Sequence, residues 1–211
     1  MKDRKTAVLM GGFGGEREIS LKSGKAVLEV LKNRGYNAIG IDVGDDLIEK
    51  LREEKIETAF VALHGPVGED GIIQAVLEFL RIPYTGSGVT ASSAAMDKVI
   101  SKRVFEAIGI PTAQWELIEK ENPFPKTVAR PMVIKPANGG SSLAVTIIAE
   151  NGAEAQIKEA VSRAFEVCDR VIAETYIPGK EITVGVLDGE PLGCVEIRPK
   201  EGFYDSEHKY T

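Results

Sequence analysis

Mainly apolar runs alternate with amphipathic stretches over the first ninety residues of the chain. Three runs have the length of a buried strand: TAVLM (6–10), NAIGIDV (37–43) and TAFVAL (58–63). Three other segments carry apolar side chains at helical spacing: 20–34, 45–55 and 72–81. Strands that alternate with helices predict parallel pairing through right-handed crossovers, and so an α/β domain.

The pattern changes after Ser87. It predicts helices over 97–109 and 153–166, and strands over 114–118, 132–136, 143–148 and 170–177. EITVGVLDGEPLGCVEI predicts a hairpin, because Asp188-Gly189 favours a type I′ turn. We therefore expect a change of architecture near residue 90. The polar end, RPKEGFYDSEHKYT, is a long loop, which we interpret as leading into a further segment.

Composition narrows the function classes. A net charge of −6 over 211 residues argues against a nucleic-acid-binding protein. The N-terminal apolar run is shorter than a secretory signal, and no stretch approaches the roughly 20 apolar residues of a membrane span. Cys168 and Cys194 fit neither a metal spacing nor a disulfide framework, which favours two reduced thiols in a cytoplasmic protein.

Two glycine-rich loops follow predicted strands, GGFGGERE (11–18) and HGPVGEDG (64–71). Ligands of parallel α/β sheets bind at the carboxyl ends of strands, where both loops fall. The second loop holds more glycines and acids than a simple strand-to-helix connection needs. We expect Glu69 and Asp70 to brace this loop and to cap the next helix. For His64 a satisfied structural imidazole remains the alternative to a binding role.

A third glycine loop, GGSS (139–142), lies between two predicted strands. This placement excludes the Walker and Rossmann fingerprints, which lead into a helix, but it allows an anion-binding nest of backbone N–H groups. An ordinary hairpin turn is the alternative. Lys135 favours the nest, because a charge inside the apolar strand MVIKP is costly without a partner. Glu174 and Glu181 flank a Pro-Gly bend, where they either bind a nucleotide or are solvated strand-end residues.

Five linked motifs carry a family resemblance. HGPVGEDGIIQA resembles the N-terminal signature of the D-alanine–D-alanine ligases. Four more segments resemble the family's substrate loop, central-domain entry, phosphate loop and closing loop, in the same order: GGFGGEREISLKSG, YTGSGVTASSAAMDKVISK, IKPANGGSSLAV and GFYDSEHKYT. The resemblance implies an ATP-grasp fold, with an N-terminal parallel α/β substrate domain followed by α+β ATP-clasping domains. The implied domains are 1–90, a central domain over 91–177 and the start of a C-terminal domain over 178–211.

The resemblance also implies a reaction. ATP phosphorylates the carboxylate of one D-alanine, and the amine of a second D-alanine attacks the acyl phosphate, giving D-alanyl-D-alanine for peptidoglycan. Glu16 would hold the first substrate's ammonium, and His64 would lie near its carboxylate. Ser141 and Tyr210 would join Glu16 in a catalytic hydrogen-bonded set.

The implied ATP-binding residues serve different parts of the nucleotide. Lys98 and Lys135 would bind phosphates and Lys209 the transferring phosphate, whereas Glu174 and Glu181 would contact adenine and ribose. The remaining members of the implied set provide the hinge, the phosphate loop and the closing loop: Tyr176, Ile177, Ser141 and Tyr204.

The family uses Mg²⁺ or Mn²⁺, and the resemblance places the metal ligands beyond Thr211, with none in 1–211. It further implies a cytoplasmic homodimer that associates through its N-terminal domain. Two other interpretations stay open: a catalytically incomplete ATP-grasp fragment that binds nucleotide, and a related ligase that forms a D-alanyl-D-lactate ester.

Overall fold

The structure, a computed structural model, describes residues 2–198 of the chain. The chain divides into two compact units, Met1–Ser101 and Lys102–Thr211. The first unit is a parallel sheet with helices, and the second is built on antiparallel strands. The predicted α/β-to-α+β change of architecture is therefore confirmed.

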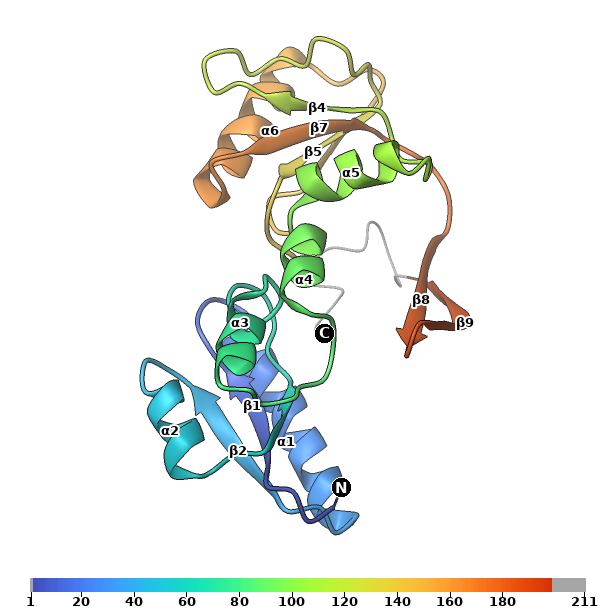
Figure 1. The fold of residues 1–211 in the computed structure, drawn as a ribbon. Coiled ribbons are helices and arrows are strands. Elements are labelled where there is room, and N and C mark those ends of the chain that lie inside the picture. Colours follow the sequence, from blue (N-terminus) through green and yellow to red (C-terminus); the bar gives the residue numbers. More distant parts are fainter. Residues whose placement is uncertain (1, 199–211) are drawn as a thin grey trace. The chain divides into compact units, whose positions relative to one another are not determined.

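The first unit contains a three-stranded parallel sheet of order β2-β1-β3. Figure 1 labels two of these strands, β1 and β2, and the helices α1 to α4. Its strands are β1 (Thr6–Gly11), β2 (Ala38–Val43) and β3 (Thr58–Val61). Its helices are α1 (Arg17–Asn33), α2 (Leu47–Glu53), α3 (Ile72–Phe79) and α4 (Val89–Met96). In β1, Thr6 lies opposite Ala38 on one side and Thr58 on the other, so the central strand is paired along both edges.

The central strand β1 is buried on both faces, which explains why its sequence is continuously apolar. Ala7 and Leu9 belong to one core cluster, with residues of α2 and α3. Val8 and Met10 belong to a second cluster, against which α1 packs. Gly24 brings α1 close to the sheet, because a Cβ atom there would lie only 2.4 Å from Met10 Cβ.

Element ends in this unit differ from the sequence prediction by up to three residues, and one helix is additional. Helix α1 begins at Arg17, before the predicted residue 20, and β3 ends at Val61 rather than 63. Helix α4 was not predicted at all. Its sequence, VTASSAAM, is rich in small residues and shows almost no apolar periodicity, so the pattern carried no helical signal.

The second unit contains a four-stranded antiparallel sheet of order β4-β7-β5-β6. Its strands are β4 (Trp115–Ile118), β5 (Met132–Pro136), β6 (Thr146–Ile148) and β7 (Val171–Thr175). Helix α6 (Glu154–Val167) packs on this sheet through Ile157, Ala160, Val161 and Ala164, which share one core cluster with strand residues. Helix α5 (Lys98–Ala107) spans the boundary between the two units.

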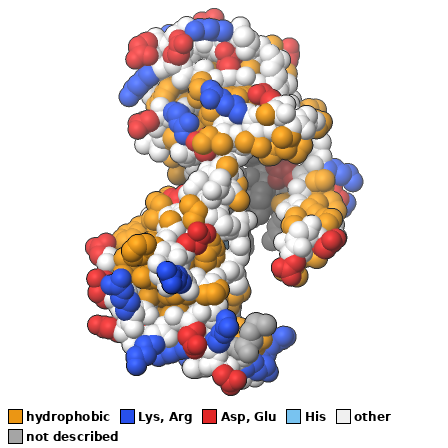
Figure 2. Space-filling view, in the orientation of Figure 1, with side chains coloured by type: hydrophobic (Ala, Val, Ile, Leu, Met, Phe, Trp, Pro, Cys, Tyr) orange, Lys and Arg blue, Asp and Glu red, His pale blue; other side chains and the backbone are white. Residues whose placement is uncertain are grey.

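The predicted hairpin consists of β8 (Glu181–Leu187) and β9 (Glu190–Ile197). Its turn residues Asp188 and Gly189 have φ angles of 52° and 84°, which confirms the left-handed pair that a type I′ turn requires. The hairpin exposes apolar side chains, visible as orange atoms on its surface in Figure 2. Within residues 2–198, no helix is both long enough and apolar enough to span a bilayer.

Candidate functional site

Glu16 and the loop that contains His64 lie together at the carboxyl edge of the parallel sheet. Glu16 directly precedes α1, after the glycine loop that follows β1. Its carboxylate approaches the backbone of Gly65 so closely that a Cβ atom there would lie 2.3 Å from Glu16 Oε2. Gly65 also has a φ of +68°, so glycine is required at this position on two counts. The structure thus brings together two loops that lie far apart in the sequence.

His64 is half-buried beside α1, where its Nε2 lies 3.4 Å from Ser23 Oγ. This contact connects the loop after β3 to α1, the helix that follows Glu16. One ring nitrogen is engaged with a hydroxyl, and the imidazole lies at the edge where substrates of parallel sheets bind.

Glu69 and Asp70 hold the same loop in shape, as the sequence predicted. Glu69 Oε2 accepts a hydrogen bond of 2.7 Å from the Gly65 amide. Asp70 accepts one from the Val67 amide at 2.9 Å and one from the Ile72 amide at 3.1 Å. Ile72 is the first residue of α3, so Asp70 satisfies one of the amides that a helix leaves unpaired at its N-terminus. These acids organise the loop and leave His64 as its candidate substrate contact.

Arg17 fixes the first glycine loop. Its guanidinium donates to both Asp42 carboxylate oxygens, at 2.7 and 2.5 Å, and to the Gly12 carbonyl at 3.1 Å. The hydrogen bond from Arg17 holds the pKa of Asp42 below its ordinary value. A Cβ atom on Gly11 would lie 2.2 Å from Asp42 Oδ1, so this ion pair packs directly on the loop backbone.

Lys135 and Glu174 form an ion pair in the second unit. Val133 lies opposite Glu174 in the β5–β7 ladder, so Lys135, two residues further along, is on the same face as a diagonal neighbour. The exposed fractions of the two side chains are only 19% and 13%. The charge inside MVIKP therefore has a partner, and both residues belong to the predicted ATP-binding set.

Lys102 joins this pair, although sequence reasoning missed it. Its Nζ lies 2.8 Å from Glu174 Oε2, and its side chain is 8% exposed. The same ammonium donates to Thr112 Oγ1 at 2.9 Å and to the Ala113 carbonyl at 3.1 Å. Its position in the sequence gave one indication of burial. Lys102 follows Val99, which is buried, by three residues and so lies on the same face of α5.

Two opposing effects act on the pKa of Glu174. Burial raises it, whereas the positive charges and hydrogen bonds of Lys135 and Lys102 lower it. The second effect is the larger, so the pKa of Glu174 lies below its ordinary value and the carboxylate is charged at neutral pH.

The GGSS loop connects β5 to β6, which confirms the predicted strand–loop–strand arrangement. Ser141, Ser142 and Ala144 have φ angles of 52°, 56° and 53°, in the left-handed region that non-glycine residues rarely adopt. Backbone outliers of this kind cluster at ligand-binding sites, where the surrounding structure maintains the strain. Ser141 therefore lies in a loop with the backbone character of a binding loop.

The other predicted site residues that the structure describes lie at the ends of helices and strands or directly beyond them. Lys98 begins α5, directly after Asp97, whose Oδ1 accepts the Val99 amide at 2.9 Å. The Tyr176 amide donates to the Pro131 carbonyl at 3.0 Å, and Ile177 is 67% exposed. Glu181 is the first residue of β8 and is exposed. Tyr204, Lys209 and Tyr210 lie outside the described residues.

A divalent metal finds no suitable ligand set in the described part of the chain. Among residues 2–198, no group of three or more His, Cys, Asp or Glu side chains could hold a metal ion. The described residues therefore provide no all-protein ligand set for Mg²⁺ or Mn²⁺.

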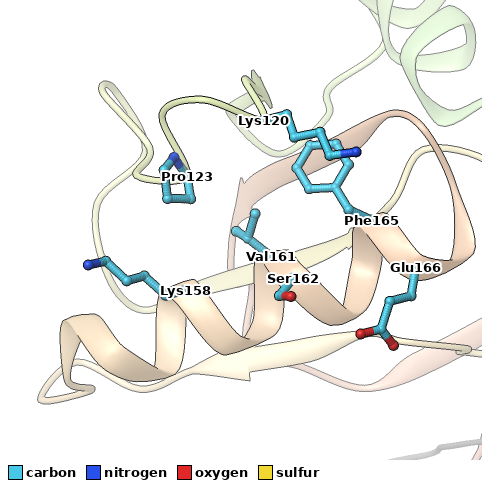
Figure 3. A pocket seen from close by; sticks show the side chains of 7 residues that line it. All are labelled: Lys120, Pro123, Lys158, Val161, Ser162, Phe165 and Glu166. Carbon is cyan, nitrogen blue, oxygen red and sulfur yellow. The ribbon is translucent and has the colours of Figure 1, made fainter.

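A separate pocket of about 420 Å³ lies against α6 (Figure 3). Its lining includes Lys120, Lys158 and Phe165, and the Lys120 ammonium lies 5.9 Å from the centre of the Phe165 ring. None of the predicted site residues lines this pocket, so it is distinct from the Lys102–Glu174–Lys135 cluster.

Comparisons with known proteins agree with the motifs. The family described as "D-ala D-ala ligase C-terminus" matches residues 104–211, and "D-ala D-ala ligase N-terminus" matches 43–87. The D-alanine–D-alanine ligase of Citrifermentans bemidjiense is 46% identical over the whole chain, which covers 68% of that relative. The corresponding ligase of Geobacter sulfurreducens is 44% identical, again over the whole chain and 67% of the relative.

The chain belongs to the D-alanine–D-alanine ligase family. It is accordingly an ATP-dependent ligase with the ATP-grasp fold. The crystal structure of the Bacillus anthracis ligase is similar, with a TM-score of 0.84 and 33% identity over 99% of this chain and 69% of that one. The same enzyme complexed with ATP gives a TM-score of 0.83 and 34% identity, over 95% and 68% of the two chains. The chain thus spans about two thirds of the length of these relatives.

Proposed function

We propose that the chain ligates two D-alanines through an acyl-phosphate intermediate and supplies D-alanyl-D-alanine for peptidoglycan in the cytoplasm. ATP phosphorylates the first D-alanine, and the amine of the second then displaces phosphate. The observation that carries the proposal is the lysine–glutamate pair on adjacent strands β5 and β7, beside the left-handed GGSS loop. Phosphoryl transfer is catalysed mainly by positioning and by neutralising charge, which a shielded lysine beside such a loop provides.

In this proposal the ATP-binding residues divide by the part of the nucleotide they contact. Lys135 and Lys98 bind phosphates, Ser141 orients them from the GGSS loop, and Glu174 accepts a hydrogen bond from the adenine amino group. Members of the set on the hinge and on the closing loop complete the contacts with adenine, ribose and the transferring phosphate: Tyr176, Ile177, Glu181, Tyr204 and Lys209. ATP carries about four negative charges, and Mg²⁺ or Mn²⁺ normally neutralises part of them.

The first D-alanine binds at the carboxyl edge of the parallel sheet. Glu16 pairs with its ammonium, and His64 lies near its carboxylate. This assignment is supported by the close approach of Glu16 to the Gly65 backbone and by the bracing of the loop that holds His64. Tyr210 and Ser141 complete the catalytic set with Glu16. We retain domains 1–90, 91–177 and 178–211 as the functional division.

We further propose that the protein is a homodimer that associates through its first unit. Helix α3 supports this, because its apolar residues are not confined to the core side. Ile72 is 52% exposed and Phe79 is 80% exposed, and their spacing of seven residues places them on one helix face. In a two-fold dimer the same face of both copies comes into contact, so the exposed apolar residues of one α3 would be covered by those of the other.

The test of the proposed function compares Lys135→Ala with Lys126→Ala. Lys126 is the control because it belongs to an ion pair of the same unit that is well exposed, with Glu119. We expect Lys135→Ala to weaken ATP binding about tenfold or more, the effect of losing roughly 1.4 kcal/mol or more, and to abolish ADP release that depends on D-alanine. Calorimetric titration and an ADP assay provide the readouts. Equal nucleotide affinity and turnover in Lys135→Ala and the unmodified protein would contradict the assignment.

A further inference from the structure

The carboxylate of Glu174 is shared by two lysines whose surroundings differ. Lys102 uses its ammonium on three acceptors: Glu174 Oε2, Thr112 Oγ1 and the Ala113 carbonyl. An ammonium has three N–H donors, so Lys102 is saturated. Its side chain is also only 8% exposed, so it is largely shielded from water.

Lys135 is held less firmly. Among the described residues its ammonium has one partner, Glu174, and its side chain is 19% exposed. Its other two donors are available to a ligand, and strand β5 leads directly into the GGSS loop. When Lys135 turns to a phosphate, however, Glu174 loses one of its two counterions. A buried carboxylate without a counterion is costly, so this movement requires another positive charge to stay in place.

We propose that Lys102 is a positioning residue that remains paired with Glu174 and thereby releases Lys135 to the phosphates of ATP. This inference rests on the proposed function, because it takes Lys135 as the phosphate ligand. It assigns to Lys102 a role that acts through Glu174, with no contact between Lys102 and the nucleotide.

Substitutions of Lys102 and Glu174 should not act independently on phosphate binding. Lys102→Met removes the standing counterion, so Lys135 must stay on Glu174, and we expect ATP and inorganic tripolyphosphate to bind roughly ten- to a hundredfold more weakly. Glu174→Gln replaces the carboxylate by a neutral amide that needs no counterion. In that background we expect Lys102→Met to change tripolyphosphate affinity by less than about threefold, since the two residues then no longer interact as charges.

Acid should partly rescue Lys102→Met. Among the described residues, the charged groups that contact Glu174 are Lys135 on β5 and Lys102 on α5. Its ladder partner on β4, Trp115, is uncharged and donates a hydrogen bond to the carboxylate of Glu106 on α5. Burial raises the pKa of Glu174, and without Lys102 only Lys135 opposes this effect. Glu174 in the variant therefore takes up its proton at a higher pH. A protonated Glu174 releases Lys135, and the affinity of the variant for tripolyphosphate, relative to that of the unmodified protein, should therefore rise between pH 8 and pH 5.5.

Calorimetric titrations of ATP and tripolyphosphate provide the test, with Lys126→Met as the matched control and thermal unfolding to monitor the fold. Equal losses from Lys102→Met with and without the Glu174→Gln substitution, or a loss that pH does not change, would overturn the inference. If Lys102→Met alone does not fold, folding of the double variant supports it, whereas unfolding of both shows a packing role and overturns it. A protein whose ATP affinity does not depend on Lys135 contradicts the proposed function itself, which is a different result.

Discussion

Glu116 illustrates how much local structure a single carboxylate can organise. Its Oε1 accepts the amides of Thr127 and Val128, both at 2.8 Å, and its Oε2 accepts the Lys126 amide at 3.0 Å. These bonds fasten the loop before β5 to strand β4. Partial burial raises the pKa of Glu116, but the three backbone hydrogen bonds outweigh it, so the pKa lies below its ordinary value.

We predict that Glu116→Gln lowers the free energy of unfolding by about 1–2 kcal/mol at pH 7, the value of charge-assisted hydrogen bonds reduced for solvent screening. A carboxyl whose folded pKa is lowered stabilises the protein above its ordinary pKa, about 4.3, and this contribution is lost as the pH falls through the folded value. Urea unfolding from pH 7 to pH 3 measures it. The difference between the two proteins should shrink below about pH 4.3; a constant difference would show that the amide contacts, and not the charge, are responsible.

Lys102 shows the limit of sequence reasoning at this scale. Lys135 could be predicted, because a lysine inside an apolar strand needs a partner. Lys102 lies on a helix with several charged residues, where one more lysine is usually solvated. Its importance depends on Thr112, Ala113 and Glu174, and only the fold brings these together.

At the scale of elements, the contact between α1 and β1 gives a prediction that opposes intrinsic propensity. Alanine is favoured over glycine by about 1 kcal/mol within a helix. At Gly24, however, the added Cβ would lie 2.4 Å from Met10 Cβ. We therefore expect Gly24→Ala to destabilise the protein by about 1–3 kcal/mol through overpacking. Thermal unfolding measures this, with Lys25→Ala on the exposed side of α1 as control; a stabilised Gly24→Ala would show that α1 is not tightly packed on the sheet.

The exposed face of α3 gives a second prediction at this scale. A charge in place of Phe79 is incompatible with an apolar two-fold contact, since the interface would then bury two like charges, one from each copy. Phe79→Asp should thus convert the proposed dimer to a monomer and leave the fold unchanged, because Phe79 is 80% exposed. Light scattering and circular dichroism provide the measurements. Glu78→Asp, at the neighbouring exposed position, is the control, and a Phe79→Asp variant that remains dimeric would remove α3 from the interface.

Elements with a strong apolar period were predictable, and those without it were not. Strand β1 and helix α6 carry clear patterns, and the structure places both close to the predicted bounds. Helix α4 consists of Val, Thr, Ala, Ser and Met, and Ser92 is its only buried residue. Its sequence therefore has no apolar periodicity from which a helix could be predicted. Strand β6 is shorter than predicted because Leu143 and Ala144, although apolar, belong to the turn that ends the GGSS loop.

At the scale of the whole molecule, the candidate binding residues fall into two groups along the chain. Glu16 and His64 belong to the first compact unit, whereas Lys135 and Glu174 belong to the second. Each group is held by contacts within its own unit, such as Gly65 with Glu69 and Glu174 with Lys102. The sequence predicted this separation, because the motifs follow one another in order, but it could not show which side chains hold each group in place.

This division predicts that the two substrates can be weakened separately. Glu16→Gln keeps the size of the side chain and removes the charge that the proposed function pairs with the ammonium of D-alanine. Because a hydrogen bond to a charged group contributes about 1.5–3 kcal/mol, we expect the affinity for D-alanine to fall roughly tenfold or more. ATP affinity should change much less, because most of its proposed ligands, including Lys135 and Glu174, lie in the other unit. Calorimetric titration with each ligand is the measurement, and Glu18→Gln, exposed in the first turn of α1, is the control. If Glu16→Gln weakened both ligands equally, its effect would be a loss of folded protein, and the assignment of Glu16 to the substrate ammonium would be wrong.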